Sequence, residues 1–335
     1  MKYSFFIGVD VSKATLDFCL VSEGKNMFHL RASNDQKGIK EFLKQCMQFS
    51  GFDVEKAVFC MEHTGIYNNP LLEFLSNSNI AAWLESSLHI KHSSGLRRGK
   101  DDKLDAEHIA RYAFRNRDQV KLWKPSRQVI KQLKSLTALR TRLIIAKKNL
   151  KTALHEGKGF LDKSIQKEIK KCCDSSLKAL EKDLKKADSK LDEVIKSDEE
   201  LNRLFSIITS VEGIGPVTAR EIIMTTNEFK TFTNPKKYAC YAGVVPFPYR
   251  SGSSIRGRNK VSHVANKSVK TLLHMSALSA IRNCQEMKKY YERKIQEGKH
   301  VMSVLNAVRN KLILRIFAVV KKNQKYDKNY VHSLV

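Results

Sequence analysis

The chain opens with Tyr3-Ser-Phe-Phe-Ile-Gly-Val-Asp10, an apolar run that ends in a carboxylate. A second run of this kind, Ala57-Val-Phe-Cys-Met-Glu62, also ends in an acid. Short runs rich in β-branched and aromatic residues are typical of buried strands. Carboxylates at the ends of such strands can hold a divalent metal against a phosphodiester. Asp10 and Glu62 are therefore candidate metal ligands.

The first 125 residues around these two runs predict an α/β unit. Helical patterns cover residues 37–49, 67–76 and 104–116. Because three strands precede the first helix, hairpins come first and crossovers later, which predicts a mixed sheet and not a purely parallel one. The five short β-prone runs span residues 3–9, 17–21, 27–32, 56–61 and 80–84.

A second acidic cluster lies in Gly99-Lys-Asp-Asp-Lys-Leu-Asp-Ala-Glu-His108. Asp102 and Asp105 are three residues apart, so both would lie on one face at the start of a helix. Together with the two strand-end acids they would offer the oxygen ligands that Mg²⁺ or Mn²⁺ prefers. The alternative is that these acids only complement the helix dipole, and Asp101 is assigned to that role.

The charge balance predicts a nucleic-acid partner. The 335 residues contain 61 Lys and Arg against 34 Asp and Glu, a net charge of +27. Such an excess favours a polyanion partner over the alternative that it only improves solubility. No signal peptide or membrane-length apolar segment is evident, so we expect a soluble cytoplasmic protein without a membrane partner. Seven cysteines without a Cys-x-x-Cys pair predict neither a disulfide framework nor structural zinc.

Three further segments follow the α/β unit, which ends at residue 125. Leucines at helical spacing, interrupted at Gly157-Lys-Gly159, predict a long helical hairpin or coiled coil over residues 126–203. The hairpin could be a spacer, a dimerisation arm or a nucleic-acid arm. A mainly α-helical C-terminal domain is expected over residues 204–322, with helices at 265–283 and 301–321. A polar tail is expected at 323–335.

Two segments of the C-terminal domain are candidate nucleic-acid contacts. Val211-Glu-Gly-Ile-Gly-Pro-Val-Thr-Ala219 resembles the turn of a helix-hairpin-helix, in which Gly213 and Gly215 would expose backbone N–H groups to DNA phosphates. A tight helix–helix turn is the alternative. The second segment is expected to be a flexible basic loop that ends at Lys260, with Ser251 as a possible nucleophile, although Ser253 and Ser254 are equal candidates by spacing. Its candidate phosphate contacts are Arg250, Arg256, Arg258 and Lys260.

Taken together, several segments resemble one family, the DEDD-type insertion-sequence transposases, which are relatives of Piv-like site-specific DNA invertases. The resemblance runs in order over residues 4 to 320. The segments are Gly8-Val-Asp-Val-Ser-Lys13, Met61-Glu-His-Thr-Gly65, Lys100-Asp-Asp-Lys-Leu-Asp-Ala106, Glu212-Gly-Ile-Gly-Pro-Val-Thr-Ala219, Tyr241-Ala-Gly-Val-Val-Pro246 and Ser251-Gly252. Asp101 and His63 depart from the small residues that are usual at their positions, but neither is a matched catalytic position.

The resemblance implies a RuvC-like, ribonuclease-H-type N-terminal domain whose acids bind Mg²⁺. By motif match these acids are Asp10, Glu62, Asp102 and Asp105, and the nucleophile is Ser251. It also implies a circular DNA intermediate and a structured guide RNA that pairs with donor and target DNA.

We therefore interpret the chain as an insertion-sequence transposase that acts as a homo-oligomer, a dimer or tetramer. One alternative is a metal-dependent Holliday-junction-type nuclease with water as its nucleophile. The other is a non-catalytic nucleic-acid-binding protein.

Overall fold

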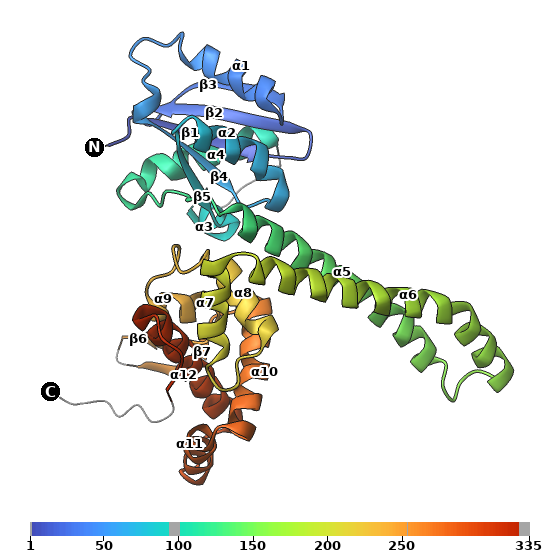
Figure 1. Cartoon of the computed structure of the whole chain (residues 1–335). Coiled ribbons are helices and arrows are strands. Elements are labelled where there is room, and N and C mark those ends of the chain that lie inside the picture. Colours follow the sequence, from blue (N-terminus) through green and yellow to red (C-terminus); the bar gives the residue numbers. More distant parts are fainter. Residues whose placement is uncertain (1, 94–100, 253, 328–335) are drawn as a thin grey trace. The chain divides into compact units, whose positions relative to one another are not determined.

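The structure is a computed structural model, and it describes residues 2–93, 101–252 and 254–327 (Figure 1). For residues 251, 255, 256 and 258 it describes the backbone alone. The chain divides into two compact units, residues 1–125 and 126–335. Each unit is described by itself, and the boundaries expected near residues 203 and 322 stay predictions.

The first unit is built on a five-stranded sheet in the order β3-β2-β1-β4-β5. The pairs β1–β2 and β2–β3 are antiparallel, whereas β1–β4 and β4–β5 are parallel. The predicted mixed α/β sheet is thus confirmed, and all five expected strands are present. They are β1 (Phe5–Val11), β2 (Thr15–Ser22), β3 (Lys25–Ser33), β4 (Ala57–Glu62) and β5 (Ala81–Glu85).

Helices cover both faces of this sheet. Helices α1 (Gln36–Cys46) and α2 (Asn69–Asn77) bury apolar side chains against one face. Helix α1 begins at Asp35, whose carboxylate accepts a hydrogen bond from the Gly38 N–H at 2.9 Å. Helix α4 (Asp102–Arg115) and the short α3 (Ser87–Ser93) pack on the other face. Helix α3 was not predicted, because seven residues are too few for a clear helical period.

Gly8 allows α4 to lie directly on β1. A Cβ atom at Gly8 would lie 2.1 Å from the Ala106 carbonyl oxygen and 2.2 Å from the Ala110 nitrogen. Ala106, Ala110 and Ala113 on the contacting face of α4 are fully buried. The strand and the helix therefore meet backbone to backbone, with only alanine methyl groups at the contact.

The second unit begins with a long hairpin formed by α5 (Gln128–Glu156) and α6 (Lys163–Lys196), as predicted. The helices that follow share one apolar core, to which α5 and α6 contribute only at their base through residues such as Ile130, Leu133 and Leu191. The α11 helix was not predicted. The remaining helices are α7 (Glu199–Thr209), α8 (Pro216–Thr226), α9 (Pro235–Tyr241), α10 (Lys267–Asn283), α11 (Gln285–Gln296) and α12 (Val301–Lys322).

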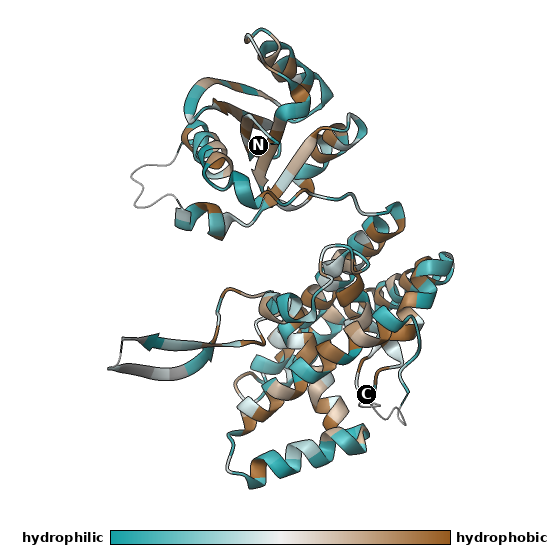
Figure 2. Ribbon diagram, turned by 90° about the vertical axis from the view of Figure 1, so that its left-hand side faces the viewer, coloured by the Kyte–Doolittle hydropathy of each residue, from teal (hydrophilic) through white to brown (hydrophobic). Residues whose placement is uncertain are grey.

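The expected basic loop before α10 is largely a β-hairpin, so that prediction was wrong. Strands β6 (Pro246–Ser251) and β7 (Ile255–Val261) pair antiparallel and extend from the helical body as a two-stranded ribbon (Figure 2). Pro246 and Pro248 lie within β6 and have no backbone N–H to donate. A two-stranded ribbon tolerates them because each strand has an open edge where no N–H donor is needed.

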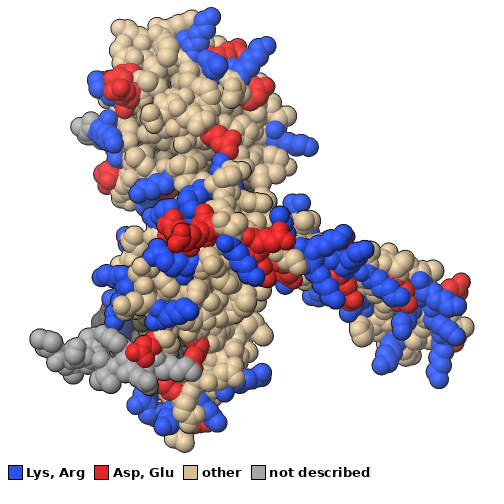
Figure 3. Space-filling model, viewed as in Figure 1, with Lys and Arg blue, Asp and Glu red and all other residues tan. Residues whose placement is uncertain are grey.

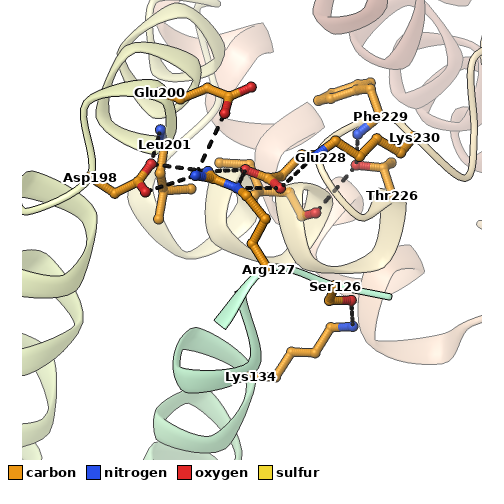
Figure 4. Close-up of polar contacts among 11 residues, drawn as sticks. Ser126, Arg127, Lys134, Asp198, Glu200, Leu201, Thr226, Glu228, Phe229 and Lys230 are labelled. Atoms are coloured by element: carbon orange, nitrogen blue, oxygen red, sulfur yellow. Dashed lines mark hydrogen bonds and ion pairs between the residues drawn. The ribbon is translucent and has the colours of Figure 1, made fainter. Parts of the chain in front are cut away.

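A cluster of paired charges ties the base of the hairpin to the helices beside it (Figure 4). The Arg127 guanidinium donates hydrogen bonds of 2.8 and 3.0 Å to the Asp198 carboxylate. It also donates to the Glu228 carboxylate, at 3.0 Å from Nε to each oxygen. Lys230 lies 3.1 Å from the same Glu228 carboxylate. Because Asp198 caps α7 through the Leu201 N–H at 2.8 Å, one arginine joins the starts of α5 and α7 to the end of α8.

None of the helices in the described part of the chain is both long enough and apolar enough to cross a membrane.

Candidate functional site

A row of four carboxylates crosses four neighbouring strands of the first unit. Asp10 on β1 lies opposite Asp17 on β2, and Glu62 on β4 lies opposite Glu85 on β5. The β1–β4 pairing sets Val9 beside Met61, so Asp10 and Glu62 follow side by side at the same sheet edge. Residues that are directly opposite each other point to the same face of a sheet. All four acids therefore share the face that α4 covers.

Helix α4 brings the other two predicted acids to this row. Asp101 is the N-cap residue, and its carboxylate accepts a hydrogen bond from the Lys103 N–H at 3.2 Å. Asp102 and Asp105 occupy the first helical turn. Because α4 rests on Gly8, two residues before Asp10 on the same strand face, its first turn lies beside Asp10. Asp101 thus has the capping role expected of it.

The pKa of Asp10 reflects the nearby acids. Burial, and after it the negative charges of Asp105, Asp102, Glu62 and Asp17, together raise the pKa of the Asp10 carboxyl from 3.8 to about 6. A carboxylate resists ionisation when others share its low-dielectric surroundings. All four acids predicted from the sequence therefore act on one another, and a bound cation would relieve their repulsion.

Asp17, at one end of the row, has cationic partners. It is buried, and its carboxylate lies 3.1 Å from His29 Nε2 and 3.7 Å from Arg31 Nε. Arg31 also reaches across to Asp102, with 3.6 Å between Nη2 and Oδ2. The sequence analysis did not select Asp17. A single acid within the apolar run Leu16-Asp-Phe-Cys-Leu20 was the signal that could have found it.

Glu85, at the other end, has its own set of donors. It accepts hydrogen bonds from Trp83 Nε1 at 3.2 Å, the Ser86 N–H at 2.8 Å and the Tyr112 hydroxyl at 3.2 Å. His89 Nδ1 lies 2.9 Å from the same carboxylate. Burial alone would raise its pKa, but the hydrogen bonds from Ser86 and His89 outweigh this and hold the pKa below its ordinary value. The sequence analysis missed Glu85 too.

The carboxylates of this site are suitable ligands for a hard divalent cation, but their side chains do not point to one common position. Carboxylate oxygens are the ligands that Mg²⁺ and Mn²⁺ prefer. Among the described residues, however, no group of three or more His, Cys, Asp or Glu side chains is arranged to hold a metal ion. The raised pKa of Asp10 and this open arrangement are compatible. Asp102 also has a cationic neighbour in Arg31, with 3.6 Å between Nη2 and Oδ2.

The remaining predicted residues belong to the second unit. Ser251 is the last residue of β6 and pairs with Ile255 of β7. Arg250 is exposed and pairs with Arg256, and Lys260 is exposed and pairs with Phe247. The Arg258 backbone is part of β7. Ser254 lies in the turn, whereas Ser253 lies outside the described residues.

The two glycines of the predicted helix-hairpin-helix differ in their surroundings. Gly213 has a φ of +91°, and a Cβ there would lie 2.6 Å from Ala280 Cβ and 2.8 Å from the Ser276 carbonyl oxygen. Its missing side chain therefore lets this turn pack on α10. Gly215 caps α8 with open space around it and without a side-chain cap. Its position leaves the start of α8 open to an anion.

Cationic side chains are spread over the visible face of the molecule. Figure 3 shows Lys and Arg along the α5–α6 hairpin and on the helices of the second unit, with acidic groups between them along the hairpin. Some of these charges are paired, such as Arg140 with Asp188 at 2.6 Å and Lys147 with Glu181 at 2.8 Å.

Comparison with known proteins identifies the family. A model described as "Transposase" matches residues 7–162, and one described as "Transposase IS116/IS110/IS902 family" matches residues 205–292. The pilin gene-inverting proteins of Moraxella bovis and Moraxella lacunata are each 25% identical over 332 residues, which cover 96% of this chain and 98% of theirs. An uncharacterized 43.6 kDa protein of insertion element IS110 from Streptomyces coelicolor is 27% identical over 129 residues, or 38% of this chain and 31% of that protein.

These matches agree with the resemblance found in the motifs. The chain belongs to the IS110-type transposase family.

Proposed function

We propose that this protein catalyses metal-dependent DNA strand cleavage and exchange for an insertion sequence, with Ser251 as the nucleophile. Membership of the family makes the chain a DNA-cleaving and recombining enzyme. The observation that carries the finer proposal is geometric: Asp10 and Glu62 follow side by side at one sheet edge, and the first turn of α4 holds Asp102 and Asp105 close enough that their charges add to burial in raising the pKa of Asp10.

Asp10, Glu62, Asp102 and Asp105 would hold Mg²⁺ or Mn²⁺. When bound, the metal supplies Lewis-acid stabilisation of charge on the phosphoryl oxygens. The strand order β3-β2-β1-β4-β5, with acids at the ends of β1 and β4, supports the assignment of this unit to the RuvC-like, ribonuclease-H-type class. Asp17 and Glu85 would act as fixed supports at either side of the site.

Ser251 would carry the DNA strand between cleavage and joining. Its Oγ forms a bond to the phosphorus and loses its proton to a nearby base, while the bond from phosphorus to the leaving sugar oxygen breaks and that oxygen gains a proton. The phosphoserine ester conserves the energy of the broken bond. A hydroxyl of the second strand then attacks the phosphorus and releases the serine. Arg250, beside Ser251, would stabilise the phosphoryl charge.

The partners follow from the family and the charge. Donor and target DNA are the substrates, a structured guide RNA is the expected specificity partner, and the enzyme would act as a homo-oligomer. Gly215 at the open start of α8 is a candidate contact for the DNA backbone. The net charge of +27 supports a polyanionic substrate.

Substitution of Ser251 tests this proposal directly. Ser251→Ala should bind nucleic acid and metal like the wild type but lose strand exchange, whereas Ser254→Ala should remain active. A protein–DNA adduct should form on the wild type and map by mass spectrometry to Ser251. If Ser251→Ala still cleaves DNA and the wild type never forms an adduct, water is the nucleophile and the junction-nuclease alternative holds.

A further inference from the structure

Two aromatic side chains stand exposed on the ribbon that carries Ser251. Phe247 is 47% exposed and Tyr249 is 66% exposed. They are alternate residues of β6, so both leave the ribbon on the same side. A shift of the pairing register between them adds local twist. Exposed aromatic rings on a protruding ribbon are costly in water unless a ligand covers them.

The Tyr249 ring lies over a glycine on the opposite strand. Tyr249 pairs with Gly257, and a Cβ at that glycine would lie 2.8 Å from Tyr249 Cδ1. The glycine thus makes room for the ring against the ribbon backbone. The outer face of the ring stays open, as its exposure shows. A flat base could lie on that face.

The charges around these rings favour a polyanion. Residues 229–285, which include the whole ribbon, contain ten Lys and Arg and no Asp or Glu. Within the ribbon, the exposed Lys260 pairs with Phe247, and the exposed Arg250 follows Tyr249. A protein partner with an apolar surface would gain nothing from ten cations without acids between them. A nucleic-acid strand uses both features, because its bases stack on rings and its phosphates attract cations.

Hydrogen bonds fix the chain just before β6 and just after β7. After β7 in the sequence, Asn266 donates from its backbone N–H to the Tyr241 carbonyl at 2.9 Å and from Nδ2 to the Tyr241 hydroxyl at 2.7 Å. Before β6 in the sequence, the carbonyl of Val244 accepts a hydrogen bond from Asn306 of α12. A ribbon anchored in this way loses little conformational freedom when it binds a ligand.

We propose that Phe247 and Tyr249 form a stacking platform for unpaired bases of a nucleic-acid strand, beside Ser251. The exposed Lys260, directly opposite Phe247 and so on the same face of the ribbon, contacts the phosphates of the same strand. This deepens the proposed function, on which it rests for the identity of the polyanion. Duplex DNA keeps its bases stacked inside, so the platform selects a strand that is opened or single.

The test measures binding of a short single-stranded DNA oligonucleotide that carries 2-aminopurine, whose fluorescence is quenched by stacking. The full chain is used in EDTA, so that no cleavage occurs. Phe247→Ala and Tyr249→Ala should each weaken binding roughly five- to 150-fold, the range expected for the loss of one stacked base. Each should also relieve the quenching. Tyr249→Phe keeps the ring and should bind like the wild type.

Two controls distinguish stacking from charge effects and from non-specific binding to exposed aromatic rings. Phe160→Ala removes a ring that is 90% exposed in the turn between α5 and α6, and it should leave binding unchanged. Lys260→Ala should make the dependence of affinity on salt shallower, whereas the aromatic variants should lower affinity without changing this slope.

Two results would overturn the platform. One is wild-type affinity and quenching in both alanine variants. The other is an equal loss of affinity for the fully paired duplex, which would show that the rings do not select open bases. Ser251→Ala should bind and quench like the wild type in this assay. Failure of the serine as nucleophile is thereby distinguished from failure of the platform.

Discussion

The two units each gather several acids around a few cations, but with opposite results. In the second unit, Arg127 is shared by Asp198 and Glu228, and Lys230 adds a further positive charge. The pKa of Asp198 is lowered, first by its hydrogen bonds from Arg127. In the first unit, burial and, after it, the negative charges of neighbouring acids together raise the pKa of Asp10 from 3.8 to about 6.

The difference fits a structural role for the cluster of the second unit and the metal-binding role proposed for the acids of the first. Charges that are matched within the chain fix helices in place and need no ligand. Where burial and neighbouring acids raise the pKa of a carboxyl group, the surrounding fold must supply the free energy needed to ionise it. Asp17 and Glu85, at the ends of the acidic row, follow the first pattern, and Asp10 follows the second.

The largest effect is expected from neutralising one of the four proposed metal ligands. Asp10→Asn or Asp105→Asn should reduce strand cleavage by roughly a thousandfold or more, since several kcal/mol of charge stabilisation by the metal would be lost. Binding of DNA should stay near the wild-type level. Cleavage of a labelled substrate and calorimetric titration with Mn²⁺ check the two parts. Full cleavage by the wild type in EDTA would rule out the metal role.

Breaking the ion-pair cluster around Arg127 should lower the free energy of unfolding instead. Arg127→Ala leaves Glu228, whose side chain is 2% exposed, with only Lys230 as a partner. We expect a loss of about 2–4 kcal/mol in the free energy of unfolding, less than for a fully buried pair because Arg127 is 31% exposed. Urea denaturation followed by helical circular dichroism measures it. Lys190→Ala, which breaks an exposed pair with Glu193, should cost under ~1 kcal/mol, and equal losses would contradict the contrast.

A smaller effect should appear in the pH dependence of stability. Folded Asp10 keeps its proton up to about pH 6, whereas the ordinary value is 3.8. The folded state thus binds more protons in this window, so the contribution of Asp10 to stability falls as pH rises from about 4 through about 6. In EDTA at neutral pH, Asp10→Asn should therefore melt a few degrees higher than the wild type. The difference should vanish below pH 4, and its persistence there would point to another cause.

The smallest effect concerns the cation that bridges the row and α4. Arg31 is 58% exposed in its side chain and lies 3.6 Å from Asp102. Arg31→Ala should therefore cost less than about 1 kcal/mol of stability in EDTA. It should slightly tighten Mn²⁺ binding, because a competing positive charge is removed. Weaker Mn²⁺ binding would mean that Arg31 orients the acids instead of competing for them.

The sequence predicted much of the α/β unit because its strands are strongly apolar and its helices amphipathic. The acids at positions 10, 62, 102 and 105 were found at strand ends and at a helix start, where local pattern is informative. The acids that lie opposite them on neighbouring strands were not found, because pairing register depends on turn geometry and on which strands are neighbours. Asp17 and Glu85 become part of the row only when register is known. The β6–β7 ribbon was missed because its exposed strands have no buried face to impose alternation.

The contact between Gly8 and α4 has a mechanical consequence. Helix α4 holds two acids in its first turn, and Tyr112, ten residues later, bonds to Glu85 at the end of β5. Ten helical residues span about 15 Å. One helix therefore carries both the two acids and the tyrosine that bonds to β5, and its close contact with Gly8 lies between them in the sequence. The placement of the two acids over the sheet is thus set by contacts that lie further along the same helix.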